Sequence, residues 1–215
     1  MVLEIIVWVD CCFIIMQLDI KEQSLILEGK KYSRKELMSL SANATGDNTS
    51  SFLLDLYRFL ADWFSDSPFM TVHTSGSTGT PKVLTVRKEQ MMQSARMTCE
   101  FLNLHTGDTA LLCMPLQYIA GKMMVVRALV AGLNLILRTP SGHPLADVTV
   151  PLRFVAMVPL QVFNTLQVLR EKERLCHTDI LIIGGGAIDA ALENEIRLLP
   201  GEIYSTYGMT ETLSH

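Results

Sequence analysis

A run of hydroxyl side chains, glycines and one lysine occupies residues 73–82, with the sequence HTSGSTGTPK. Glycine permits positive φ and lets a chain approach a ligand closely. Backbone N–H groups in such a turn bind anions, and hydroxyl and ammonium groups add donors for phosphate oxygens. The run differs from the common P-loop, because Pro81 precedes the lysine and Val83 follows it. We therefore predict a different polyphosphate loop, formed by Thr74, Ser75, Gly76, Ser77, Thr78, Gly79, Thr80 and Lys82.

A second motif follows the apolar run ILII at residues 180–183 and consists of Gly184, Gly185, Gly186 and Ala187. A bare backbone of this kind offers a flat wall on which a planar base can lie. The motif fails the dinucleotide-binding fingerprint, because Asp189 stands where the third glycine is required. Taken alone, it favours the simpler interpretation of a tight turn from a strand into a helix.

A third motif is STYGMTET at residues 205–212. Tyr207 offers an aromatic face for stacking a base, and Thr210 offers a hydroxyl to a phosphate. Glu211 offers a hard oxygen ligand to Mg²⁺, which binds carboxylates together with phosphate oxygens. The alternative is a polar turn with a solvated glutamate. Because the segment follows the two other motifs, we favour the binding interpretation.

Strands alternate with helices from residue 69 onward, and this alternation must position the motifs. Runs such as FVAMV and ILII have no polar face, which is typical of a largely parallel sheet covered by helices. We predict an α/β fold with strands at 69–73, 83–86, 110–114, 133–137, 153–158, 180–183 and 202–205. Helices are predicted at 88–102, 119–130, 160–173 and 190–198. Ligands bind at the carboxyl ends of strands in such sheets, so the three motifs are expected to meet around one ligand.

The first 68 residues are expected to form a lead-in of strands and helices, and residues 69–215 the α/β core. We predict a hairpin near residues 24–31, then a helix whose start is a capping box of Ser33 and Glu36. Residues 41–51 are predicted to be a linker and residues 52–64 a helix. The apolar residues 1–16 lack the basic start and cleavage site of a signal peptide, which favours a buried strand or a segment upstream of the domain.

The composition indicates a globular cytoplasmic protein. Of its 215 residues, 49% are hydrophobic and 19% charged, which excludes a disordered chain. A net charge of −4 argues against a nucleic-acid partner, and we find no span for a membrane. The five cysteines lack CxxC spacing, so a reducing compartment is expected, and Cys113 is interpreted as a buried apolar residue. Lys88, Glu89 and Arg96 are predicted on a solvated helix face, and homo-oligomerisation stays open.

Taken together, HTSGSTGTPK, GGGA and STYGMTET resemble the adenylate-forming family of acyl-CoA ligases, luciferases and nonribosomal peptide adenylation domains. The resemblance runs from about residue 69 to the last residue. Between the motifs, HTGDTALLCMPLQYIAGK resembles the family stretch that borders the acyl site. Within the family, MPLQYIAGK and YGMTETLSH are most similar to the o-succinylbenzoate–CoA ligases of menaquinone biosynthesis.

The resemblance implies a role for each motif. Residues 74–82 hold the β- and γ-phosphates of ATP, Gly184–Ala187 and Tyr207–Gly208 enclose adenine, Thr210 contacts the α-phosphate, and Glu211 binds Mg²⁺. The carboxylate substrate is bordered by Tyr118, Gly121, Val158, Pro159 and Leu160. Tyr118 stands where many members carry a histidine, which implies a different pocket wall.

The reaction implied by the family has two halves. A carboxylate attacks the α-phosphorus of ATP, and coenzyme A then displaces AMP from the acyl-adenylate. The family continues past this point with a ribose-binding aspartate, a hinge and a lysine-bearing domain, so we expect an N-terminal piece that retains nucleotide contacts without turnover. The alternatives are another acyl-CoA ligase, an amino-acid adenylation domain and a non-catalytic nucleotide-binding module.

Overall fold

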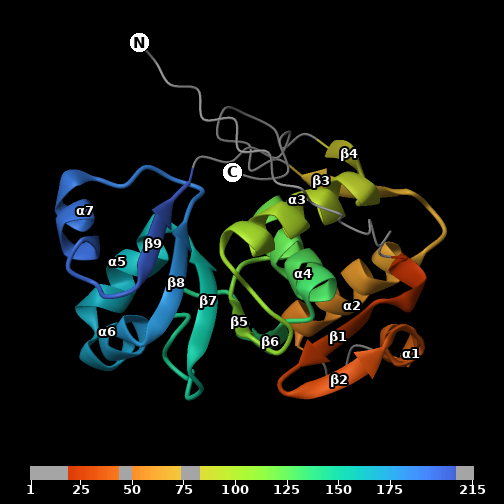
Figure 1. The fold of residues 1–215 in the computed structure, drawn as a ribbon, viewed down its shortest axis with the longest axis horizontal. Helices are drawn as coiled ribbons and strands as arrows, with labels where there is room; N and C mark the ends of the chain where they lie inside the picture. Colours follow the sequence, from red (N-terminus) through yellow and green to blue (C-terminus); the bar gives the residue numbers. More distant parts are fainter. Residues whose placement is uncertain (1–18, 44–49, 74–82, 207–215) are drawn as a thin grey trace, which may run out of the picture.

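The computed structural model describes residues 19–43, 50–73 and 83–206 (Figure 1). The phosphate-loop residues 74–82 and the third motif from Tyr207 to Glu211 therefore lie outside the described residues, as does the apolar segment 1–16.

A seven-stranded sheet forms the centre of the structure, in the order β2-β1-β6-β5-β7-β8-β9. The six strands β1, β6, β5, β7, β8 and β9 are parallel to one another. The edge strand β2 pairs antiparallel with β1. The prediction of a mostly parallel α/β fold is confirmed. The strands are β1 (Ser24–Leu27), β2 (Lys30–Ser33), β5 (Thr109–Leu112), β6 (Asn134–Leu137), β7 (Leu152–Met157), β8 (Thr178–Ile183) and β9 (Glu202–Ser205).

The chain winds in two directions from the middle of this sheet. From β5 it passes through α4 (Ile119–Ala131) to β6, toward the β2 edge. From β7 it passes through α5 (Pro159–Gln167) and α6 (Leu169–Cys176) to β8, and through α7 (Ala190–Ile196) to β9 (Figure 1). Because such crossovers are right-handed, α4 and the α5–α7 group cover opposite faces. The direction changes between β5 and β7, and ligands bind in α/β sheets at such a switch point.

The strand before the phosphate-loop motif does not belong to this sheet, so the prediction that it is one of the strands of the parallel sheet is wrong. β3 (Phe69–His73) pairs antiparallel with β4 (Val83–Arg87) in a separate two-stranded sheet. Met70 and Val72 are buried while their neighbours are exposed, and this alternation is typical of an antiparallel strand with one covered face. His73 still reaches the main sheet region, because it forms an isolated parallel bridge with Tyr118.

The N-terminal hairpin and the two helices after it follow local sequence signals. Glu28 and Gly29 join β1 to β2 with φ values of 48° and 82°, as a two-residue hairpin turn requires. The Ser33 N–H donates to Glu36 (2.8 Å) and the Glu36 N–H to Ser33 Oγ (3.4 Å), which confirms the predicted capping box. A short 3₁₀ turn (Ile20–Glu22) precedes β1. The helices α1 (Arg34–Asn43) and α2 (Ser51–Phe64) follow β2.

Three further expectations need correction. The linker predicted at 41–51 begins too early, because α1 continues to Asn43 and the Ser41 hydroxyl bonds inside the helix to Leu37 O. The helix predicted at 160–173 is two helices, because the extended backbone of Val168 ends α5 and its carbonyl starts α6. Lys88, the first residue of α3 (Lys88–Phe101), is buried rather than solvated, since its ammonium donates to Ser65 O at 2.9 Å.

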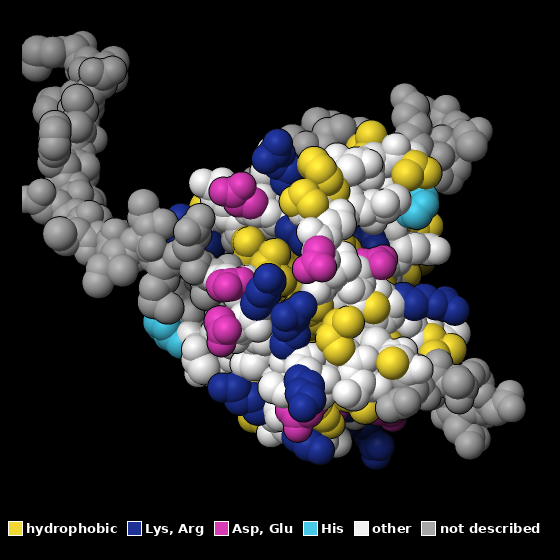
Figure 2. All heavy atoms as spheres, turned by 90° about the vertical axis from the view of Figure 1, so that its right-hand side faces the viewer, with side chains coloured by type: hydrophobic (Ala, Val, Ile, Leu, Met, Phe, Trp, Pro, Cys, Tyr) yellow, Lys and Arg dark blue, Asp and Glu magenta, His cyan; other side chains and the backbone are white. Residues whose placement is uncertain are grey.

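Surface charge on the side that carries α1, α2 and the β1–β2 hairpin is mixed. Figure 2 shows lysine and arginine side chains interspersed with acidic ones on this face, with small hydrophobic areas between them. Such a distribution is typical of solvent-exposed surface. Within the described residues, no helix combines the length and the apolar character needed to cross a bilayer.

Candidate active site

The loop after β5 and the start of α4 carry two of the predicted substrate-border residues. Tyr118 precedes the first residue of α4, and 37% of its surface is exposed. Its N–H donates to Pro115 O (3.3 Å), and its carbonyl accepts the N–H of Lys122 (3.3 Å). Gly121 is buried in the first turn of α4, directly against Pro115. The bridge to His73 places Tyr118 beside the residue that precedes the phosphate-loop motif.

The loop after β7 forms the neighbouring wall. Val158 has an extended backbone before α5, and Pro159 occupies the first helical position, where its fixed φ suits a helix start. The Val158 N–H donates to Gln161 Oε1 at 3.1 Å. This bond is half of a capping box, in which the residue at the third helical position reaches back to the N-cap.

The triple glycine after β8 lies against this wall. The Gly184 N–H donates to Met157 O at 3.1 Å, and Gly185 has a φ of +79°. A Cβ atom on Gly185 would lie 3.4 Å from Val158 Cγ1, and one on Gly186 would lie 3.5 Å from the Pro159 ring. The predicted base-binding and substrate-border segments are therefore in contact.

The end of β9 lies beside the same loop. Both the N–H and the hydroxyl of Thr206 donate to Ile183 O, at 2.8 and 3.3 Å. Ser205 and Thr206, the first two residues of the third motif, therefore lie beside the carboxyl end of β8. Asp189, which breaks the dinucleotide fingerprint, has an ordinary structural role: its carboxylate accepts the Leu192 N–H (2.8 Å) and caps α7.

Two groups of predicted residues are thus assembled at adjacent strand ends. Tyr118 and Gly121 contact β3 and the β5 loop, whereas Gly185 and Gly186 pack on Val158 and Pro159. The residues predicted to bind phosphates and magnesium lie outside the described residues. Their flanking residues, His73 and Thr206, lie at the carboxyl edge beside these two groups.

Gln161 is one residue that sequence reasoning missed. It is buried, and its amide nitrogen donates to Cys113 O (3.2 Å) and Ser141 O (2.9 Å). The bond to Val158 could have been predicted from the sequence. Pro159 marks the start of a helix, Val158 is then the N-cap, and Gln161 stands at the third helical position, as in a capping box. The bonds to Cys113 and Ser141 depend on tertiary structure and have no signal in the sequence.

Arg127 is a second missed residue. It lies in the middle of α4, is 2% exposed, and has no ion-pair partner within residues 19–43, 50–73 and 83–206. Its Nε also has no hydrogen-bond partner there, and Nη1 contacts Met124 Sδ at 3.8 Å. Burial lowers the pKa of Arg127 to about 10. A buried cation of this kind is costly unless an anion approaches it.

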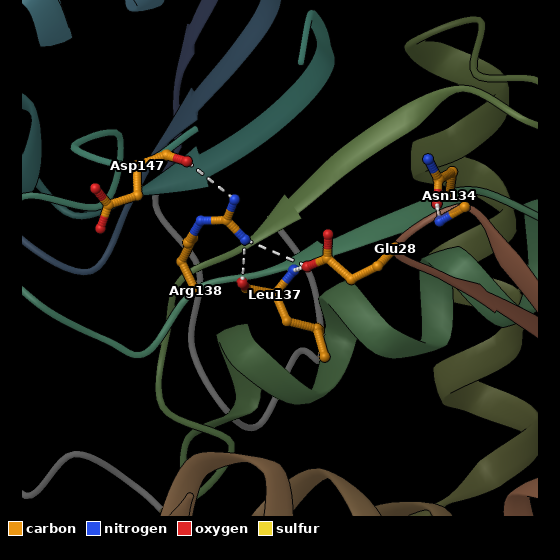
Figure 3. Close-up of polar contacts among 6 residues, drawn as sticks. Glu28, Asn134, Leu137, Arg138 and Asp147 are labelled. Carbon is orange, nitrogen blue, oxygen red and sulfur yellow. Dashed lines mark hydrogen bonds and ion pairs between the residues drawn. The ribbon is translucent and has the colours of Figure 1, made fainter. Parts of the chain in front are cut away.

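Glu28, which follows β1, forms an ion pair with Arg138, which follows β6 (Figure 3). Glu28 Oε1 accepts the Leu137 N–H (2.7 Å) and lies 3.3 Å from Arg138 Nη1. Arg138 also donates to Leu137 O (2.6 Å) and Asp147 O (3.1 Å). Asn134 Oδ1 accepts the Gly29 N–H at 2.8 Å, so the hairpin turn is fixed to β6.

Cys113 is buried. Burial raises the pKa of its thiol to about 12, and its Sγ lies 3.6 Å from Ala156 O. The expectation of a small buried apolar residue is confirmed. The described residues contain no group of three or more His, Cys, Asp or Glu side chains arranged to hold a metal, and Glu211 lies outside them.

An open groove lies at the opposite edge of the sheet, near the amino end of β1 and the carboxyl end of β2. None of the predicted site residues borders it. It is lined by Lys21, Glu22, Gln23, Ser24, Ser33, Arg34, Lys35 and Met38.

Comparison with curated proteins gives 2-succinylbenzoate–CoA ligases among the relatives. A family model described as AMP-binding enzyme matches residues 9–215. The 2-succinylbenzoate–CoA ligase of Haemophilus influenzae is 30% identical over 162 residues, which cover 75% of this chain and 35% of that protein. The ligase of the same name from Enterococcus faecalis is 31% identical over 150 residues, covering 66% and 30%. The chain thus spans about a third of the length of these relatives.

Solved structures share the same fold. An acyl-CoA synthetase (AMP-forming)/AMP-acid ligase II-like protein from Dyadobacter fermentans is 35% identical, with a TM-score of 0.73 over 83% of this chain and 51% of that chain. The O-succinylbenzoate coenzyme A synthetase of Bacillus subtilis, in complex with ATP and magnesium ion, has a TM-score of 0.64 at 17% identity. The second likeness covers 93% of this chain and 59% of that chain and concerns the fold alone.

Proposed function

The chain belongs to the AMP-binding enzyme family, and from this premise we propose that it forms the nucleotide- and carboxylate-binding part of an ATP-dependent carboxylate–CoA ligase. The observation that carries the proposal is the close approach of the triple glycine to the loop after β7: the Gly184 N–H donates to Met157 O, and a Cβ atom on Gly185 or Gly186 would touch Val158 or Pro159. This contact brings the segment proposed for adenine against the segment proposed for the carboxylate. Both lie at the edge where α/β sheets bind ligands.

The proposed nucleotide site uses backbone and hydroxyl groups more than charged side chains. Residues 74–82 hold the β- and γ-phosphates, Thr210 the α-phosphate, and Gly184–Ala187 with Tyr207 and Gly208 the adenine. The described part of this site fits a planar base, because Gly184, Gly185 and Gly186 present backbone without side chains. Glu211 would hold Mg²⁺, which supplies positive charge against the phosphates when bound.

Catalysis in this proposal consists of orientation. The substrate carboxylate must lie in line with the α-phosphorus, and holding two reactants in this geometry accounts for a large part of the rate. Tyr118, Gly121 and Pro159 border the carboxylate, and the rigid contacts of Gly121 and Pro159 keep that border in place. Attack of the carboxylate on the α-phosphorus would release pyrophosphate and give an acyl-adenylate. The coenzyme A thiolate would then displace AMP and form the thioester, so no protein nucleophile is needed. The buried, protonated thiol of Cys113 is consistent with this.

For the acyl substrate we propose o-succinylbenzoate, which carries two carboxylates. One carboxylate reacts, and the other needs a positive partner within the protein. Arg127 supports this assignment, because it is buried on the helix that starts at the substrate border and lacks an acidic partner among the described residues. The substrate named for the Haemophilus influenzae relative agrees with a dicarboxylate.

Isothermal titration calorimetry tests this function. We expect MgATP to bind, and o-succinylbenzoate to bind in the presence of a non-hydrolysable ATP analogue and Mg²⁺. Benzoate and succinate serve as comparison ligands and should bind more weakly than o-succinylbenzoate. MgATP binding without any carboxylate binding would favour the non-catalytic nucleotide-binding module, and absence of MgATP binding would contradict the ligase.

We further propose a cytoplasmic location. Cys99, Cys113 and Cys176 are free thiols in the structure, which suits a reducing compartment.

A further inference from the structure

We propose that Gln161 is a positioning residue for the carboxylate half of the site, because its side chain joins three separate segments at the switch point. This inference rests on the proposed function and adds to it a residue outside the sequence motifs. The three segments are the loop after β5 at Cys113, the start of α5 at Val158, and the chain after β6 at Ser141.

The hydrogen bonds of Gln161 use the whole amide group. Its nitrogen has two N–H donors, which reach Cys113 O at 3.2 Å and Ser141 O at 2.9 Å. Its oxygen accepts the Val158 N–H at 3.1 Å. An amide turned over would place its oxygen against two carbonyl oxygens, so the three partners determine the orientation. Gln161 is 6% exposed, its bond to Cys113 O is buried, and its bonds to Val158 and Ser141 are partly buried.

One of the three segments is itself firmly held. His143 Nδ1 and Glu171 Oε1 are 2.9 Å apart, which joins the segment after Ser141 to α6. Arg174 Nη1 donates to Leu145 O at 2.6 Å and also bonds to Ala146 O. The chain after β6 therefore lies fixed along the α5–α6 pair. Gln161 links the β5 loop to this fixed support.

The segments joined by Gln161 carry the proposed substrate border. Cys113 starts the loop that leads to Tyr118 and Gly121, and Val158 immediately precedes Pro159. The nucleotide-binding segments, by contrast, contain no partner of the Gln161 side chain among the described residues. Loss of the Gln161 bonds should therefore weaken carboxylate binding more than MgATP binding.

Two substitutions test this role, with a matched control on the same helix. Gln161→Glu keeps the acceptor for the Val158 N–H but turns an ionised oxygen toward Cys113 O and Ser141 O. Gln161→Met keeps the length and removes all three bonds without adding charge. The control is Gln167→Glu, the same change at the exposed last position of α5. Calorimetry measures o-succinylbenzoate with a non-hydrolysable ATP analogue and Mg²⁺, and the nucleotide alone.

We expect both Gln161 variants to weaken o-succinylbenzoate binding about tenfold and nucleotide binding less than about twofold, with Gln167→Glu like the unsubstituted chain. Equal weakening of both ligands, or no weakening, would overturn the positioning role and leave the ligase proposal standing. Unfolding of both variants at 25 °C, followed by circular dichroism, would assign Gln161 to folding alone and overturn it as well. If the unsubstituted chain binds neither ligand, the proposed function fails, and this inference fails with it.

Discussion

Gly121 lies so close to the loop after β5 that a Cβ atom on it would stand 2.4 Å from the carbonyl oxygen of Pro115. No side chain fits at that distance unless backbone moves, so glycine is needed for the close approach of α4 to this loop. The contact keeps Tyr118 and the start of α4 in one arrangement. Stability and substrate binding should both depend on it.

The substitution Gly121→Ala tests this approach. We expect it to lower the free energy of unfolding by about 1–3 kcal/mol, as overpacking a close contact does. Gly186→Ala is the matched control, because its Cβ would meet Pro159 at 3.5 Å, an ordinary contact distance. Urea unfolding of both variants measures the difference. Equal stability of the two variants would contradict the assigned role of Gly121.

Arg127 should oppose folding while it favours binding of a dicarboxylate. Arg127 has no acidic partner among the described residues. Replacing such a buried charge with an apolar side chain of similar length removes a desolvation penalty, so Arg127→Met should unfold at the same or a higher urea concentration. The same variant should bind o-succinylbenzoate at least tenfold more weakly and benzoate unchanged. Arg96→Met on the exposed face of α3 is the control. Unchanged o-succinylbenzoate affinity in Arg127→Met would remove the argument for a dicarboxylate.

Alkaline pH should destabilise the fold through Cys113. Its pKa rises from the ordinary value of 9.0 to about 12 on folding, so the unfolded thiol loses its proton first. Stability from the protonated native thiol is complete below pH 9 and is lost as the pH rises toward 12. The decline of unfolding free energy between pH 8 and 10 should be smaller in Cys113→Ala. Parallel pH profiles of the two proteins would contradict the buried, protonated thiol.

Thiol labelling gives an independent check of the same burial. Burial raises the pKa of Cys99 to about 11, and both Cys99 and Cys113 are buried, whereas Cys176 is partly exposed. Mass spectrometry of peptides after a short exposure to iodoacetamide should show Cys176 modified well before Cys99 and Cys113. Faster modification of Cys113 than of Cys176 would show that the loop after β5 is open.

The Glu28–Arg138 pair should contribute modest stability, because both groups are partly exposed. Glu28→Ala leaves the Leu137 N–H without its side-chain acceptor, and we expect a loss of about 1 kcal/mol in unfolding free energy. Glu28→Gln retains an oxygen acceptor for Leu137 and should lose less. Glu22→Ala, on the 3₁₀ turn at the other end of β1, is the control. A Glu28→Gln variant as unstable as Glu28→Ala would mean that the carboxylate charge, not the bond to Leu137, matters.

Sequence patterns predicted the parts of the fold that depend on local or two-sided burial. FVAMV and ILII are apolar at every position, and β7 and β8 are indeed buried in the parallel sheet. The Ser33–Glu36 capping box was equally open to prediction, because both partners lie within four residues. The residues of β3 alternate between exposed and buried positions, a pattern typical of an antiparallel strand with one covered face. The sequence prediction placed β3 in the parallel sheet instead.

The remaining features depend on contacts between distant segments. Lys88 has the helical spacing of a solvated position. Its ammonium nevertheless donates to the backbone carbonyl of Ser65, the residue that follows α2. The contacts of Gln161 with Cys113 and Ser141 span 48 and 20 residues. The composition around Arg127 indicates only a core helix, and its lack of an acidic partner within residues 19–43, 50–73 and 83–206 becomes evident only once the neighbouring elements are placed. Such residues cannot be found from periodicity.

Hydrogen–deuterium exchange with and without MgATP and o-succinylbenzoate tests the central claim that the loops after β5, β7 and β8 form one ligand site. The account predicts joint protection of peptides covering residues 113–121, 158–161 and 184–187, with little change in residues 21–38 around the groove at the opposite edge. Protection confined to that groove, or to one of the three loops, would contradict it.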